Sequence, residues 1–248
     1  MMKTNYKCYI DSIQIRYNNL KLQPLYLERY NYVLEKNGIY KFKYRHNNKN
    51  YNIFEVENHK DNRGIEYQLL TFNGFKKYNE RDDLIKKIFY EIIQLLKDND
   101  ITFFLNKIDL SIDFYDVDIT DLFGIQKRKS QGVRRVLLED LDGKSIDEIR
   151  TNKRTFYLEP TTKEKKRYQH SKIYNKSRKE NLSSVIYRFE VVLSNFSNVE
   201  KIDILNYKNN LLDEIKHRYN KYSIEVFNEK IHFDFSLVED IVNQTVRL

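Results

Sequence analysis

The sequence has few of the residues that build disulfide and zinc sites. Its 248 residues include one cysteine, Cys8, and five histidines. One cysteine cannot form an internal disulfide, and no Cys/His spacing in the chain resembles a set of zinc ligands. These absences exclude a disulfide-stapled secreted fold and a zinc module, and they favour a reducing compartment.

Long apolar runs are also absent. No window approaches the roughly eighteen apolar residues that a membrane-spanning helix needs. The first residues, MMKTNYKCYIDSIQ, lack the apolar stretch of a secretory signal. We therefore expect a soluble protein of the cytoplasm with no membrane partner.

Charged and aromatic residues are abundant. The chain has 44 Lys and Arg against 36 Asp and Glu, a formal net charge of +8, and 20 Tyr with 15 Phe, which is enough to build a folded core. A positive balance favours a polyanionic partner. A composition biased toward Lys, Asn, Ile and Tyr would also make the chain basic. The distribution of charge along the chain must therefore distinguish a polyanionic partner from a compositional bias.

Strand and helix patterns mix without the regular alternation of a parallel α/β protein. We expect an α+β fold, with an antiparallel or mixed sheet and helices on one face, and a duplicated sheet unit is an open alternative. Alternating polar and apolar residues predict an antiparallel meander of strands at 8–17, 38–46, 50–57 and 66–72. A helical period predicts one helix over 81–100 that covers the sheet.

A strand over 103–118 has two different faces. Ile108, Leu110, Ile112 and Phe114 point one way, and Asp109, Ser111, Asp113 and Tyr115 point the other. Aspartate is unfavourable in strands, so the polar face indicates either a divalent-cation site or solvated carboxylates on an open sheet. Residues four apart on a strand lie about 13 Å apart, so both carboxylates can ligate one ion only if a bulge intervenes.

The segment 163–179 concentrates positive charge. It holds one acidic residue, Glu164, and eight basic residues: Lys163, Lys165, Lys166, Arg167, Lys172, Lys176, Arg178 and Lys179. A solvated loop is one interpretation. Because Tyr168, His170 and Tyr174 lie among these residues, nucleic-acid binding through phosphate contacts and base stacking is favoured.

Two further strands flank this basic segment. One is TFYLEP at 155–160, which Pro160 ends. The other, at 185–193, has an apolar face and carries Arg188 and Glu190 on the opposite face. If this strand neighbours that of 103–118, then Asp109, Asp113, Arg188 and Glu190 share one face, and the basic segment reaches the same surface.

These segments together resemble a known family. The ordered set KIDLSIDFYD, TFYL, KIYNKSRKEN and IYRFEVVL is similar to the replication initiators of rolling-circle plasmids of Gram-positive bacteria and the related initiation factors of filamentous phages. The match covers about residues 105–195, and a weaker similarity begins at YIDSIQIRY. The sequence EPTTKEKKRYQH departs from the family, which often has Gly and Ser after the TFYL-type strand.

The resemblance implies a nickase. It makes Tyr174 the nucleophile that leaves a 5′-phosphotyrosine and a free 3′-OH, with Mg²⁺ or Mn²⁺ held by Asp113 and Glu190 and supported by Asp109. Lys172 and Lys176 would neutralise phosphate and favour the phenolate. The predicted DNA contacts are Lys166, Arg167, Lys172, Lys176, Arg178, Lys179 and Arg188. The implied partners are origin DNA, single-stranded or in a hairpin, a host helicase and polymerase, and a second copy of the chain.

We expect three regions in the chain. Residues 1–100 form a sheet-and-helix half, 101–198 a catalytic half, and 199–248 a helical region, although one continuous unit also fits. Residues 119–152 are interpreted as an insertion or a helical connection. The last region is predicted to contain a helix near 203–219, a strand at 222–227 and a terminal helix.

Other interpretations stay open. Tyr168 is a second candidate nucleophile, Tyr187 is predicted to be core, and His170 is interpreted as a bystander. The His-hydrophobic-His pair of other tyrosine nickases is absent from the sequence. A DNA-binding initiator or repressor without nicking activity is the main alternative. An RNA-binding sheet is disfavoured, because the positions expected to be exposed are Asp, Ser and Arg instead of aromatic residues.

Overall fold

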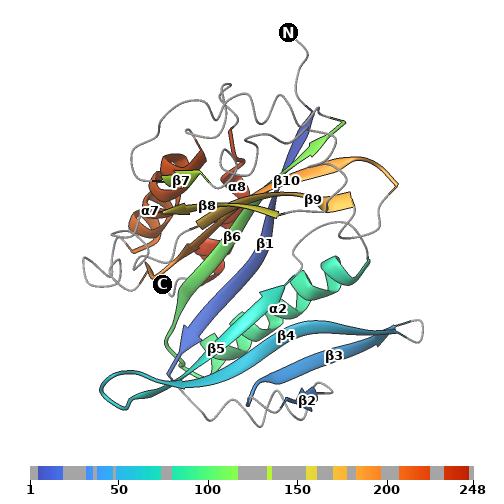
Figure 1. Cartoon of the computed structure of the whole chain (residues 1–248). Helices are drawn as coiled ribbons and strands as arrows, with labels where there is room; N and C mark the ends of the chain where they lie inside the picture. The colour runs from blue at the N-terminus through green and yellow to red at the C-terminus, as the bar shows by residue number, and fades with distance from the viewer. Residues whose placement is uncertain are drawn as a thin grey trace. The chain divides into compact units, whose positions relative to one another are not determined.

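The computed structural model in Figure 1 describes residues 5–18, 32–35, 38–46, 49–73, 80–116, 133–135, 155–160, 170–177, 183–196, 207–223 and 232–245. The chain forms two compact units. Unit 1 comprises Met1–Tyr9, Asp109–Asn195 and Asn209–Leu237, and unit 2 comprises Ile10–Ile108, Phe196–Lys208 and Val238–Leu248. The region boundaries predicted at residues 100 and 198 stay a prediction.

Unit 2 is built on an antiparallel meander. Its strand order is β2-β3-β4-β5-β1-β6. The elements are β1 (Tyr6–Tyr17), β2 (Tyr32–Leu34), β3 (Tyr40–His46), β4 (Lys49–Lys60), β5 (Glu66–Asn73), α2 (Glu80–Asp98) and β6 (Phe103–Tyr115). Strands β1 and β6 are shared between the units: β1 belongs to unit 2 from Ile10 onward, and β6 belongs to it as far as Ile108. The strands predicted at 38–46, 50–57 and 66–72 form an antiparallel meander as expected, whereas the strand predicted at 8–17 pairs with β5 instead of with the strand that follows it in the sequence.

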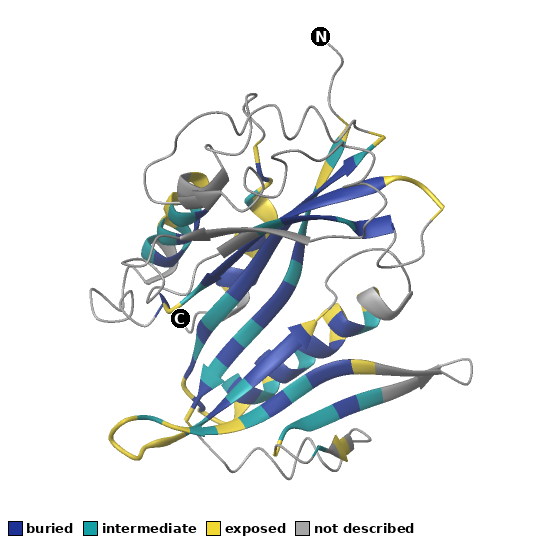
Figure 2. Ribbon diagram, viewed as in Figure 1, coloured by how far each residue is buried: buried dark blue, intermediate teal, exposed yellow. Residues whose placement is uncertain are grey.

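An aromatic ladder forms the core of unit 2. The register places Phe42 opposite Phe54, and Phe54 opposite Phe72, with ring centroids 4.2 and 5.5 Å apart. Phe89 of α2 meets Phe72 edge-on at 5.2 Å. The apolar residues of α2 recur with the helical period, so they line one side of the helix, and that side packs on the sheet. Figure 2 shows the buried stripe along α2.

Unit 1 holds the second group of strands. Their order is β1-β6-β10-β9-β8-β7, where β6 enters from Asp109. The elements are β7 (Val133–Arg135), β8 (Thr155–Pro160), β9 (His170–Asn175), β10 (Ile186–Ser194) and α7 (Tyr207–Ser223, from Asn209), while α8 (Ser236–Thr245) begins here and continues in unit 2. All pairings among β7, β8, β9 and β10 are antiparallel.

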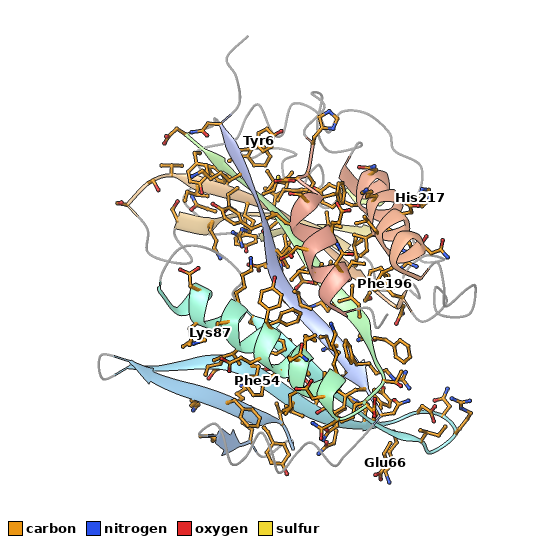
Figure 3. All side chains as sticks on the ribbon, turned by 180° about the vertical axis from the view of Figure 1, so that it is seen from behind. Tyr6, Phe54, Glu66, Lys87, Phe196 and His217 are labelled. Carbon is orange, nitrogen blue, oxygen red and sulfur yellow. The ribbon has the colours of Figure 1, made fainter. Side chains whose placement is uncertain are left out.

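Helix α7 covers the apolar face of unit 1. Leu110, Ile112 and Phe114 of β6 and Phe189, Val191 and Leu193 of β10 are fully buried, as are Leu211 and Ile215 of α7. The Arg218 guanidinium donates a hydrogen bond of 2.8 Å from Nη1 to the Ser194 carbonyl, which ties the helix to the end of β10. Figure 3, seen from behind, shows α7, which carries the labelled His217, on the near side of unit 1.

The expected α+β fold is confirmed, with one error at the C-terminal end. Tyr222 and Ser223, predicted to begin a strand, belong to α7. The apolar positions Leu211, Ile215 and Tyr219 continue the helical period to that point, which outweighs the local alternation. Residues 224–227 lie outside the described part, as does 119–152 apart from β7. None of the described helices is long and apolar enough to cross a membrane.

Candidate functional site

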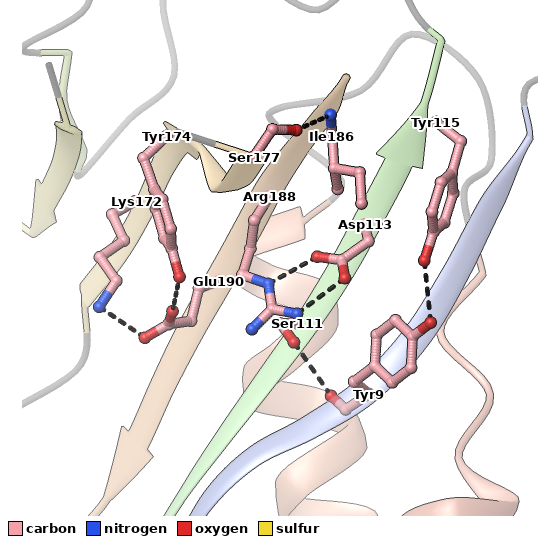
Figure 4. A network of polar contacts seen from close by, with 10 residues as sticks. All are labelled: Tyr9, Ser111, Asp113, Tyr115, Lys172, Tyr174, Ser177, Ile186, Arg188 and Glu190. Carbon is pink, nitrogen blue, oxygen red and sulfur yellow. Dashed lines mark hydrogen bonds and ion pairs between the residues drawn. The ribbon is translucent and has the colours of Figure 1, made fainter. Parts of the chain in front are cut away.

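The pairing of β9 with β10 assembles the polar face of unit 1. In its register Tyr174 lies opposite Arg188, and Lys172 lies opposite Glu190. Directly paired residues of an antiparallel sheet project from the same face. The register therefore gathers the tyrosine, two basic side chains and a carboxylate on one surface, shown in Figure 4.

Ser177 fixes the connection between these two strands. Its hydroxyl donates a hydrogen bond to the Ser184 carbonyl and accepts one of 2.5 Å from the Ile186 N–H. The side chain is buried, so these bonds satisfy backbone groups that water does not reach. The serine of the IYNKS segment thus holds the start of β10 against the end of β9.

Glu190 is the centre of a buried polar cluster. The Tyr174 hydroxyl donates to Glu190 Oε2 at 3.1 Å, and Lys172 Nζ lies 2.6 Å from Oε1. Tyr174 itself is 5 % exposed. Two ammonium groups lie near its ring, with Lys172 Nζ at 5.8 Å and Lys176 Nζ at 5.9 Å from the centroid. The phenol of Tyr174 thus has a carboxylate as its hydrogen-bond acceptor and two ammonium groups near its ring.

Arg188 and Asp113 form a second pair beside this cluster. The guanidinium contacts both carboxylate oxygens, with Nε 2.5 Å from Oδ1 and Nη2 2.7 Å from Oδ2. Both side chains are fully buried. Such a two-bond contact fixes the guanidinium plane and keeps a positive charge next to Tyr174.

The polar face is buried, which corrects the expectation that its positions are exposed. Ser111, Asp113, Arg188 and Glu190 are each at most 2 % exposed, and Asp109 is 6 % exposed. Charged groups tolerate such burial because they pair with one another. Tyr187, predicted to be core, is also buried.

The two partners of the Tyr174–Glu190 contact have shifted pKa values. Burial, followed by the charge of Glu190, raises the pKa of the Tyr174 phenol, and Arg188 only partly opposes this. Burial favours the neutral form of Glu190, but Lys172, Arg188 and the Tyr174 hydroxyl together bring the pKa of the carboxyl below its ordinary value of 4.5. The resting site therefore holds a neutral phenol against an ionised carboxylate.

The predicted metal ligands do not fit a divalent ion in the arrangement described. Both oxygens of Asp113 contact Arg188, and the two oxygens of Glu190 contact Lys172 and Tyr174. Within the described ranges no three His, Cys, Asp or Glu residues are grouped as a metal site would need. The Mg²⁺ or Mn²⁺ cofactor and its ligands Asp109, Asp113 and Glu190 stay a prediction.

Solvent access divides the predicted DNA contacts. The Lys172 side chain is 21 % exposed, whereas Lys176 and Arg188 are fully buried and cannot touch DNA directly in this structure. Four of the predicted contacts, Lys166, Arg167, Arg178 and Lys179, lie outside the described residues, as does the alternative nucleophile Tyr168. His170 begins β9.

Sequence reasoning missed Tyr9. Its ring lies beside Arg188, whose Cζ is 5.8 Å from the centroid, and its hydroxyl is 3.0 Å from that of Tyr115. Strict alternation from Ile13 would place Tyr9 on the apolar side of its strand. The alternation of polar and apolar residues therefore could not predict that Tyr9 lies beside Arg188. The N-terminal YIDSIQIRY similarity was the one available signal that this strand belongs with the site.

Comparisons with known proteins find similarity among solved structures and none among sequences. No family model matches the sequence, and no curated protein matches it. Among solved structures, the chain is similar to the rolling circle replication initiator protein from Geobacillus stearothermophilus, with a TM-score of 0.46 and 13% sequence identity, over 85% of this chain and 78% of that chain. A similarity of this size transfers no residue roles.

Proposed function

We propose that this chain is a replication initiator that binds DNA and nicks one strand by attack of Tyr174 on a phosphodiester. One observation carries the proposal: the Tyr174 hydroxyl donates a hydrogen bond to Glu190 of the neighbouring strand, and two lysine ammonium groups lie near the tyrosine ring. A phenol that must act as a nucleophile needs such an acceptor, because few phenols are ionised near neutral pH.

The spatial meeting of the three motifs supports the proposal. KIDLSIDFYD forms part of β6, KIYN ends β9, and IYRFEVVL forms β10, and the order β6-β10-β9 makes them neighbours in unit 1. Asp113, Arg188 and Tyr174, one from each motif, lie on one face (Figure 4). Segments separated by tens of residues in sequence therefore contribute to one site.

The charges of this face offer a phosphodiester one accessible cation. Lys172, Lys176 and Arg188 provide three formal positive charges, and Asp109, Asp113 and Glu190 provide three formal negative ones. Of these three cations, Lys172 has a partly exposed side chain, whereas Lys176 and Arg188 are fully buried. Lys172 is therefore the one of the three that a DNA phosphate can contact.

The proposed reaction exchanges one phosphate ester for another. The Tyr174 O–H proton passes to Glu190, and the phenolic oxygen bonds to phosphorus while the bond from phosphorus to the 3′ oxygen breaks. The 3′ oxygen leaves with that electron pair and takes a proton from water. The products are a 5′-phosphotyrosine and a free 3′-OH, which primes synthesis by a host polymerase.

A second function, DNA binding without nicking, is favoured by the burial of Tyr174. The phenol is 5 % exposed and its pKa is raised, which suits a structural hydrogen bond as well as a held nucleophile. Nicking requires the phenol to become accessible when DNA binds, whereas a non-catalytic initiator or repressor does not.

A covalent conjugate separates the two functions. The full chain is incubated with a random-sequence pool of single-stranded DNA and with supercoiled plasmid, in Mg²⁺ or Mn²⁺ and in EDTA, and is then denatured. The nickase yields a conjugate resistant to denaturation and nicked plasmid, and Tyr174→Phe loses both while it still binds DNA. Binding without a conjugate in any of these conditions identifies the second function.

A further inference from the structure

The polar face of unit 1 reaches solvent beyond Arg188, on strands β6 and β1. Arg188 is fully buried, and its Cζ lies 5.8 Å from the centroid of the Tyr9 ring. The hydroxyls of Tyr9 and Tyr115 are 3.0 Å apart, and both tyrosines are half-buried. Lys7 is exposed, and its Nζ lies 5.6 Å from the centroid of the Tyr115 ring. Figure 4 shows the two tyrosines on the side of Arg188 away from Tyr174, so these contacts lead from the buried site to the surface.

Hydrogen bonds hold the two tyrosines in place. The Tyr115 N–H donates to the Asn5 carbonyl at 3.0 Å, and the Ser111 hydroxyl donates to the Tyr9 carbonyl at 3.4 Å. Both bonds join β6 to the N-terminal end of the chain. The contact between the two phenol hydroxyls also fixes each ring relative to the other. A surface that is ordered before its ligand arrives loses less conformational entropy on binding.

An aromatic ring beside an exposed ammonium suits one kind of ligand. Bases of single-stranded nucleic acids stack on aromatic side chains, while basic side chains contact the phosphates. In a duplex the face of each base is covered by its neighbours, so a stacking surface selects unpaired strands. At the solvent edge of the polar face, Tyr115 supplies the ring and Lys7 supplies the positive charge.

We propose that Tyr115 and Lys7 bind the single-stranded DNA that flanks the phosphodiester attacked by Tyr174: one base stacks on the Tyr115 ring, and Lys7 contacts an adjacent phosphate. The inference rests on the proposed function and adds to it the form of DNA that the site accepts. Tyr9 is a positioning residue, because its hydroxyl holds the Tyr115 ring. The substrate is therefore DNA that is unpaired next to the cleaved bond.

Fluorescence anisotropy with a labelled single-stranded DNA of random sequence tests the contact, in the Tyr174→Phe chain so that no conjugate forms. Tyr115→Leu should weaken binding about tenfold or more, because one base loses its stacking partner. Tyr115→Phe keeps the ring and should restore the affinity. Lys7→Met should lower the slope of log Kd against log salt by about one. Affinity for the same DNA made double-stranded should be unchanged in Tyr115→Leu, because the faces of paired bases are covered.

Tyr90 and Lys86 of α2 provide the matched control. Lys86 Nζ lies 5.8 Å from the centroid of the Tyr90 ring, and here too the lysine is exposed and the tyrosine half-buried. The Tyr90 hydroxyl also makes a hydrogen bond, to Asp240. Tyr90→Leu and Lys86→Met therefore remove the same chemical groups from unit 2. Both should leave the affinity and the salt slope as in the parent chain.

A crosslink locates the base without any substitution. The single-stranded DNA is prepared with 5-iodouracil in place of thymine and irradiated on the wild-type chain, and the joined peptides are identified by mass spectrometry. We expect a crosslink to Tyr115. This measurement also decides the matter if circular dichroism shows that Tyr115→Leu does not fold.

The outcomes separate this inference from the proposed function. Equal affinities of Tyr115→Leu and Tyr90→Leu, equal losses for single-stranded and double-stranded DNA, or crosslinks that omit Tyr115 overturn the stacking site and leave nicking by Tyr174 standing. Weaker binding by Tyr115→Leu, when the wild type forms no covalent conjugate, supports the stacking site and identifies DNA binding without nicking. A wild-type chain that binds no single-stranded DNA overturns both.

Discussion

Tyr174 and Arg188 face each other across the antiparallel pairing of β9 and β10, and Arg188 in turn holds Asp113 of β6 by two bonds. The guanidinium therefore connects the tyrosine to the acidic strand. Sequence separation between these residues is large, so only the fold makes them neighbours. The consequences of this arrangement for stability and chemistry can be measured.

Asp113→Ala should destabilise the protein by about 3–5 kcal/mol, because it leaves the Arg188 charge buried without its carboxylate. Urea unfolding followed by circular dichroism measures the loss. In the double variant with Arg188→Met the loss should be smaller, since both charges are then removed. A loss below about 1 kcal/mol for Asp113→Ala would contradict the buried pair.

Glu66→Ala provides the matched control for this measurement. Glu66 pairs with Lys60 at 2.7 Å, but the two side chains are 44 % and 67 % exposed. Pairs in water contribute little to stability. The free energy of unfolding should therefore stay close to that of the wild type, which shows that burial of the charges decides the effect of Asp113→Ala.

Glu190→Gln should change how stability depends on pH. The pKa of Glu190 is lowered in the folded protein from an ordinary value of 4.5, so its ionised form stabilises the fold above that pH. This contribution disappears as the pH falls through the folded pKa. The difference in unfolding free energy between wild type and Glu190→Gln should be largest at neutral pH and shrink below pH 4.5. If the difference in unfolding free energy grew as the pH falls, the pKa of Glu190 would be raised in the folded protein, which would contradict the prediction.

Ser177→Ala should cost about 1–3 kcal/mol of stability, because the buried Ile186 N–H loses its acceptor. Thermal unfolding of the variant measures the cost. Ser184→Ala is the matched control, since its backbone carbonyl, which accepts the Ser177 hydrogen bond, is retained. Equal effects of the two substitutions would show that the Ser177 hydroxyl does not hold the strand connection.

Removal of divalent ions tests the cofactor implied by the family resemblance. Nicking should stop in EDTA and return with Mg²⁺ or Mn²⁺. Because Arg188 occupies both oxygens of Asp113, the Mn²⁺ concentration that gives half-maximal activity should be the same in Asp113→Asn as in the wild type. An increase of about tenfold or more would identify Asp113 as a ligand or as a close support of one.

Periodicity predicted the strands and the main helix, because unit 2 buries one face of each element. The apolar stripe of α2 and the alternation in β3, β4 and β5 match the observed elements within a few residues. The motif order also brought Asp113, Tyr174, Arg188 and Glu190 to one face, as expected. Alternation indicates which side a residue lies on, and the structure confirms this for β6 and β10.

Burial of the polar face and the partners of its charges could not be predicted. A strand with Asp and Arg on one side is typical of a solvated surface, and only the pairing of Asp113 with Arg188 allows both to lie inside. Nor could local patterns show that Lys172 and Tyr174 occupy both oxygens of Glu190. Such partners depend on the register between distant strands, which one sequence does not specify.

The most direct measurement is to locate the DNA on the protein. After incubation with the random-sequence pool, the conjugate is digested with protease and nuclease and its peptides are sequenced by mass spectrometry. We predict a phosphonucleotide on Tyr174 and none in the Tyr174→Phe variant. A nucleotide on Tyr168, or a conjugate that persists in Tyr174→Phe, would contradict it.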